Sequence, residues 1–163
     1  MDTDKDDEKP SGGGKVMKSD PELSWRAKAY ELIEKAFQYD VDIAVVFLLS
    51  AVEIAASAII MCSKERKLRA SLCRLSTKKR LNRALSILRK EGYISHQEYL
   101  LIRKTLRNLR CIRNSMLHPI CAERCSEIDL SSVISVVKKF IALADRYVIE
   151  NCEPSAAADS AIR

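Results

Sequence analysis

Residues 43–62 read IAVVFLLSAVEIAASAIIMC, and this stretch decides the fold. Its only charged residue is Glu53, and it contains neither glycine nor proline. A helix that is apolar on every side is typical of the centre of a helical bundle, where other helices cover it. The stretch therefore predicts a central buried helix that begins at Asp40 or Asp42.

The same stretch is also long enough to cross a lipid bilayer, because a helix of this length rises by about 30 Å. Two features favour a bundle in water instead. Glu53 lies near the middle, where a bilayer makes an ionisable group costly, and the alanines and serines dilute the hydrophobicity. We therefore expect no membrane association.

Amphipathic helical patterns flank the central stretch on both sides. Upstream, SDPELSW predicts a first helix that starts at Pro21, with Asp20 as its N-cap. Downstream, three more helix starts are predicted from capping residues: Ser76, the capping box of Ser95 and Glu98, and Asp129. No stretch keeps the two-residue period of a strand. We predict an all-α fold, an antiparallel up-and-down four-helix bundle with an additional short helix or turn.

The two ends of the chain differ in composition from the rest. Residues 1–18 are acidic and then Gly/Ser-rich, with too little apolar content to offset the entropy of ordering them. We predict a disordered arm over residues 1–18, a helical bundle over residues 19–152 and a flexible tail over residues 153–163.

The chain has six cysteines, and its first residues, MDTDKDDEKP, lack the basic and apolar regions of a secretory signal. A cytoplasmic, reducing location is therefore expected, with the cysteines as free, buried thiols rather than a disulfide framework. The spacing of Cys111, His118, Cys121 and Cys125 matches no standard zinc pattern. We expect no metal and no other cofactor.

Positive charge is concentrated in the middle of the sequence. Residues 66–122 carry 15 basic and 2 acidic residues, a net charge of +13, against +6 for the whole chain. Such a segment attracts polyanions such as nucleic acid or anionic lipid; the alternative is a set of solvated helix faces. The candidate RNA-binding residues are Lys78, Lys79, Arg80, Arg107 and Arg110.

Within this segment, residues 111–120 read CIRNSMLHPI and place an arginine where a core residue is expected. Ile102, Leu106, Leu109, Arg113 and Met116 follow one another at spacings of 4, 3, 4 and 3 residues, so Arg113 continues an inward-facing stripe. A buried guanidinium needs anions or acceptors around its donors. The other charge predicted on a buried surface, Glu53, is its candidate partner; the alternative is a water-facing Glu53.

Asn114 and His118 lie one helical turn apart beside this arginine, and Pro119 ends the helix at the histidine. A histidine takes up or gives a proton near neutral pH, and an arginine holds phosphate oxygens and stabilises developing charge. The trio is therefore suited to phosphodiester chemistry. The alternative is a histidine that only caps the carbonyls at the helix end.

The stretch LRNLRCIRNSMLHPI, an inward Arg113 and Asn114 followed by His118 and Pro119 at a helix end, resembles the R-x4-6-H signature of the HEPN superfamily of small helical-bundle domains. The context is similar too, with a long apolar second helix holding an internal Glu, LLSAVEIAASAI, and a short GYISHQE connector before the motif helix. The resemblance covers about residues 22–150.

The resemblance implies a metal-independent endoribonuclease that leaves 2′,3′-cyclic phosphate ends and works as a homodimer with a composite active site. Arg113 would bind and polarise the scissile phosphate, His118 would act as general base or acid, and Asn114 would orient one of them. A role as a toxin or defence component, with an antitoxin or nucleotidyltransferase partner, is also implied. The alternative is a non-catalytic RNA- or nucleotide-binding module or an antitoxin-type partner.

Overall fold

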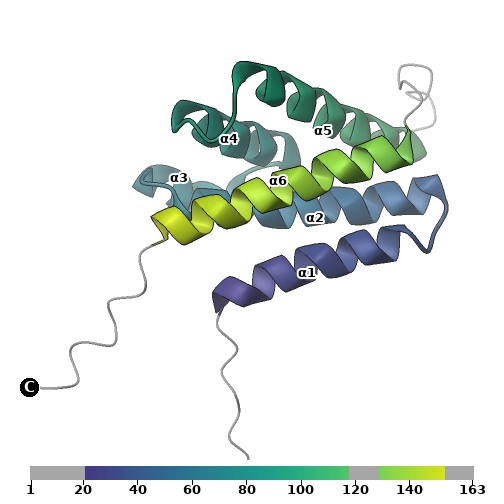
Figure 1. Cartoon of the computed structure of the whole chain (residues 1–163), viewed down its shortest axis with the longest axis horizontal. Coiled ribbons are helices and arrows are strands. Elements are labelled where there is room, and N and C mark those ends of the chain that lie inside the picture. Colours follow the sequence, from purple (N-terminus) through teal and green to yellow (C-terminus); the bar gives the residue numbers. More distant parts are fainter. Residues whose placement is uncertain (1–20, 118–128, 153–163) are drawn as a thin grey trace, which may run out of the picture.

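The computed structural model describes residues 21–117 and 129–152, and no strand occurs among them (Figure 1). The predicted all-α class is therefore confirmed, whereas the arm over residues 1–18 and the tail over residues 153–163 lie outside the described residues. The elements are α1 (Pro21–Ala36), α2 (Val41–Cys62), α3 (Arg66–Ser71), the 3-10 turn η1 (Leu72–Arg74), α4 (Thr77–Lys90), α5 (His96–Leu117) and α6 (Leu130–Asn151).

The helices begin at the capping residues that the sequence predicts. Ser76 Oγ accepts the backbone N–H of Lys79 at 3.4 Å at the start of α4, and Asp129 accepts the N–H groups of Ser131 and Ser132 at the start of α6. Each bond satisfies a donor that the first helical turn leaves without a partner. Short-range hydrogen bonding therefore fixes these helix starts.

A complete capping box starts α5. The backbone N–H of Ser95 donates to Glu98 Oε2 at 2.9 Å, and the N–H of Glu98 donates to Ser95 Oγ at 3.2 Å. Glu98 also accepts the Lys139 ammonium of α6 at 2.7 Å, so one carboxylate both caps α5 and joins it to α6. These contacts, Lys139 foremost, lower the pKa of Glu98 to about 2.

Replacing Glu98 with glutamine should destabilise the fold at neutral pH and make little difference in strong acid. Because the pKa of Glu98 is lowered on folding, its contribution is present above its ordinary pKa of 4.5 and is lost as the pH falls towards about 2. Urea unfolding at pH 7 and at pH 2 measures the difference. Glu34→Gln, an exposed carboxylate on α1 outside the described ion pairs, is the matched control. An equal loss for both variants would contradict this role for Glu98.

The apolar helix α2 lies at the centre, as predicted. Eleven of its residues are buried, and α1, α6, α5 and α4 all pack against it (Figure 1). Around α2, α1 contacts α6, α6 contacts α5 and α5 contacts α4, but α1 and α4 are not packed against each other. The ring of helices is therefore open on one side, and one face of α2 lies uncovered there.

Contacts at the helix ends show the helix directions. Cys62 and Cys152 join the C-terminal ends of α2 and α6, so these two helices run the same way. Tyr93, between α4 and α5, hydrogen bonds to Glu150 and Asn151 at the end of α6, so α5 runs against α6. Since α4 and α5 are joined by a short connection and run antiparallel, α4 runs with α2 and α6. The segment that holds α3 and η1 returns the chain between α2 and α4, so the predicted antiparallel up-and-down order is wrong for these two consecutive long helices.

The prediction of free, buried cysteines is wrong for three of the described residues. Cys62 and Cys152 form a disulfide, and Cys111 is disulfide-bonded as well. Cys73 is free but exposed rather than buried. The spacing of cysteines along the chain does not reveal that the ends of two distant helices meet, which is what brings Cys62 and Cys152 together.

Within the described part of the chain, α2 is the one helix long and apolar enough to cross a membrane. The other helices bury 56% of its most apolar 18-residue stretch. The core helix of a soluble bundle can be equally long and apolar. The packing of four helices around α2 is the arrangement expected of such a core.

Candidate nucleic-acid interface

A basic groove lies between α4 and α5. Its cavity has a volume of about 250 Å³, and two kinds of side chain line it. Leucine side chains form the apolar part of the lining, and lysine, arginine and asparagine side chains form the polar part. The apolar residues are Leu81, Leu85 and Leu106, and the polar residues are Lys78, Asn82, Arg103, Arg107 and Arg110.

Helical periodicity explains why these side chains meet. Arg103, Arg107 and Arg110 follow one another at spacings of four and three residues, so they share one side of α5. Lys78 and Asn82 are four residues apart and share one side of α4. The leucines beside them are buried, or nearly so, and hold the two helices together, so the polar groups from both helices come together along their junction.

The groove has a net positive charge with no internal compensation. None of the residues that line it is acidic. The pKa of Arg110 is lowered, first because burial disfavours the charged guanidinium and then because Arg113 and Arg107 lie close to it. A bound anion would relieve both effects, so the groove is suited to hold phosphate.

Arg113 continues the core stripe of α5, as the sequence predicts. Ile102, Leu106 and Leu109 are almost completely buried, and Arg113 is half-buried at the next position of the stripe. Its Nε atom is enclosed by the protein and has no hydrogen-bond partner. The stripe stops there, because Met116 is 40% exposed rather than buried. Arg113 therefore has an enclosed, unpaired Nε donor, and its side chain lies close to Arg110 of the basic groove.

Of the other two residues of the motif, Asn114 and His118, the structure describes only Asn114. Asn114 is exposed on α5 and makes none of the side-chain hydrogen bonds of the described residues. His118, the predicted general base or acid, lies outside the described residues, as do Pro119, Cys121 and Cys125. Arg113 and Asn114 therefore lie in the last turns of α5, just before the residues that the structure does not describe.

The predicted pairing of Glu53 with Arg113 is wrong for the described residues, because no ion pair or hydrogen bond joins these two side chains. Glu53 instead lines a cavity on the open side of α2, together with Arg80 of α4. Glu53 lies near the middle of α2, whereas α5 ends at the end of the molecule where α2 begins (Figure 1). Because Glu53 faces the open side of α2, between α1 and α4, it does not reach Arg113 on α5.

The five candidate RNA-binding residues lie in three different places. Lys78, Arg107 and Arg110 line the basic groove, Lys79 is exposed outside it, and Arg80 lies in the cavity with Glu53. Sequence reasoning missed two further groove residues, Arg103 and Asn82. Their helical spacing from Arg107 and Lys78 was the available signal.

Comparisons with known proteins add no assignment to this geometry. No protein-family model, no curated protein and no solved structure matches the chain.

Proposed function

We propose that this protein binds RNA along the groove between α4 and α5. The observation that carries the proposal is the convergence of Lys78, Arg103, Arg107 and Arg110 on one cavity without an acidic residue. Phosphate oxygens accept hydrogen bonds from all four side chains, and the amide of Asn82 adds a group that contacts a sugar or a base edge.

We further propose that the protein cleaves the bound RNA without a metal, as the HEPN resemblance implies. Arg113 supports this step, because its side chain is only half-buried and lies close to the groove residue Arg110. In the proposed reaction Arg113 holds the scissile phosphate and His118 takes the 2′-hydroxyl proton. The 2′-oxygen attacks phosphorus, the bond from phosphorus to the 5′-oxygen breaks, and the 5′-oxygen leaves as a hydroxyl with a proton from water. Asn114 orients the histidine or the phosphate.

The HEPN resemblance also implies a finer topology and an assembly, both of which belong to this proposal. A four-helix bundle of that family would consist of α2, α4, α5 and α6, with α1 packed as an added helix against α2 and α6. The composite active site would form where two copies bring their motifs together. A toxin or defence role, with an antitoxin or nucleotidyltransferase partner, follows from the same resemblance.

The direct test is to incubate the purified full chain with single-stranded RNA in EDTA and to identify the 3′ ends of the products. Cyclic phosphate ends that disappear in His118→Ala are expected. Binding is measured separately on an RNA with 2′-deoxy substitutions, which the proposed chemistry does not cleave. Binding that weakens steeply with salt, with no cleavage at any protein concentration, would support the alternative of a non-catalytic RNA-binding module. No binding at low salt would contradict the whole proposal.

A further inference from the structure

The uncovered side of α2 has a regular apolar pattern. We define the α2 open face as Ile43, Phe47, Ser50, Ile54, Ser57 and Met61, which follow one another at spacings of 4, 3, 4, 3 and 4 residues. None of the six is buried, and Ile43 and Met61 are 46% and 53% exposed. Alternating spacings of three and four residues are the pattern that packs one helix along another in a coiled coil.

The polar residues of this face do not depend on water. Ser50 Oγ donates to the carbonyl of Val46 at 2.9 Å, and Ser57 Oγ donates to the carbonyl of Glu53 at 2.8 Å. Because both hydroxyl protons are bonded within the helix, covering these serines leaves no unsatisfied donor. The α2 open face is therefore prepared for burial by another surface.

We propose that a second copy of this chain covers the α2 open face, with the two α2 helices antiparallel. The face is complementary to itself in shape about a two-fold axis near residue 52. That axis places Phe47 opposite Ser57 of the second copy, Ile54 opposite Ser50, and Met61 opposite Ile43. Large side chains thus meet small ones at the centre, as knobs meet holes in a helix pair, and the same contacts occur twice, as a two-fold interface requires.

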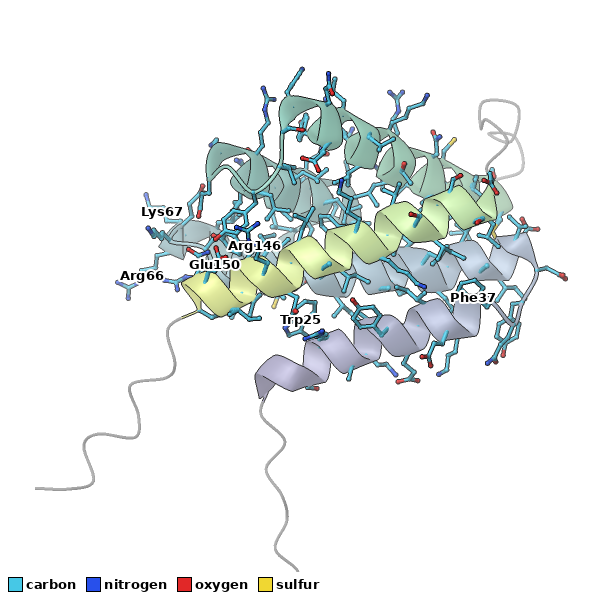
Figure 2. All side chains as sticks on the ribbon, in the orientation of Figure 1. Trp25, Phe37, Arg66, Lys67, Arg146 and Glu150 are labelled. Carbon is cyan, nitrogen blue, oxygen red and sulfur yellow. A yellow bond between two sulfur atoms is a disulfide. The ribbon has the colours of Figure 1, made fainter. Side chains whose placement is uncertain are left out.

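The charges at the two ends of α2 favour the antiparallel direction. The N-terminal end carries the exposed residues Asp40 and Asp42. Just beyond the C-terminal end lie Lys64, Arg66 and Lys67, all exposed, and Arg66 and Lys67 extend from α3 into solvent (Figure 2). An antiparallel pair places each acidic end beside the basic end of the other copy, whereas a parallel pair would place like charges together. The helix dipoles favour the same direction.

The flanks of the face leave room for this contact. A cavity of about 580 Å³ lies over its C-terminal half, between Trp25 of α1 and Arg80 of α4, and Figure 2 shows Trp25 pointing from α1 towards α2 and α6. Glu53 lies to the α4 side of the face, where it shares the cavity with Arg80. The two-fold axis keeps both Glu53 side chains on the α4 flank of the pair, where Arg80 of each copy lines the same cavity and offsets the negative charge.

This contact is separate from the proposed catalytic assembly. The axis passes through the middle of α2, whereas α5 carries Arg113 near the end where α2 begins (Figure 1). The two motifs would therefore lie at opposite ends of the α2 pair, with both basic grooves open. Self-association through α2 should persist whether or not the protein cleaves RNA.

Mass measurement of the full chain over a range of concentrations tests the contact. Ile54→Arg should sediment at half the mass of the wild type: at one chain mass, 18.4 kDa, where the α2 contact is the one contact between copies, and at twice the chain mass where the composite active site forms as well. Leu101→Arg, which changes a 52% exposed leucine on α5, is the matched control and should keep the wild-type mass. Circular dichroism checks that Ile54→Arg remains folded; if it does not, the cross-linking experiment below decides.

Cysteine cross-linking tests the direction of the pair. Ile43→Cys and Met61→Cys are prepared as separate proteins in a Cys73→Ser background, which removes the exposed free thiol of the described residues, and the Cys73→Ser parent is the control. Under mild oxidation each should stay uncross-linked alone, because the axis separates like positions by the length of the helix. A mixture of the two should give a covalent dimer.

Several outcomes would overturn the proposal. A wild-type chain that is monomeric at all concentrations would do so, as would an Ile54→Arg variant that keeps the wild-type mass. Cross-linking of the Ile43→Cys protein with itself, and of the Met61→Cys protein with itself, would show a parallel pair. Partition of the wild type into phosphatidylcholine vesicles, abolished by Ile54→Arg, would show that lipid rather than a second copy covers the face.

Discussion

Replacing Arg113 with leucine should raise the free energy of unfolding while abolishing RNA cleavage. The enclosed Nε atom lacks a hydrogen-bond partner, and such a buried donor costs folding free energy. Leucine would extend the stripe of Ile102 and Leu109 without that cost, so we expect a gain of about 1 kcal/mol in urea unfolding. Loss of one group that stabilises transition-state charge should lower the cleavage rate about 100- to 1000-fold.

The opposite signs of the two effects make this variant informative. A structural arginine would give the reverse result, with lower stability and unchanged cleavage. Arg107→Leu is the matched control, since Arg107 lies on the same helix but is exposed. It should weaken RNA binding without the gain in stability. If Arg113→Leu cleaves RNA at the wild-type rate, Arg113 has no part in the reaction.

Reversing the charge of Arg110 should weaken RNA binding about 10- to 100-fold at low salt, since charge-assisted hydrogen bonds contribute about 1.5 to 3 kcal/mol each. Arg110 lies between Arg107 and Arg113, and its pKa is lowered by burial and by both neighbours. In the absence of RNA, a glutamate at this position removes that repulsion. Arg110→Glu should therefore lose affinity without losing stability.

The control for Arg110→Glu is Arg83→Glu, which makes the same change in net charge on an exposed part of α4 outside the groove. Fluorescence anisotropy of a labelled RNA at several salt concentrations compares the two. Arg110→Glu should also flatten the dependence of affinity on salt, because fewer phosphate contacts form. Equal losses for both variants would mean that affinity reflects net charge alone, and the groove would lose its assigned role.

Features of this fold that depend on neighbouring residues could be predicted from the sequence. The reciprocal bonds of Ser95 and Glu98 involve residues three apart, so the sequence contains all that the capping box requires. The burial of α2 follows from its composition, and the partial burial of Arg113 follows from the period of its own helix. In each case the cause lies within one or a few helical turns.

Features that depend on how two helices are placed could not be predicted. Helical periodicity does not show that Glu53 faces the open side of α2 rather than α5, and the expected ion pair is absent from the described residues. The disulfide between Cys62 and Cys152 joins residues 90 positions apart, and the groove needs α4 beside α5 before Asn82 and Arg103 share a cavity. These relations arise from packing.

The bond between Cys62 and Cys152 turns the 90-residue separation between them into a covalent ring that contains both α4 and α5. A protease that cuts the backbone once, anywhere between the two cysteines, therefore releases no fragment. The nicked chain keeps both walls of the basic groove attached to the same molecule, and its pieces separate on a denaturing gel only after a thiol reagent opens the ring.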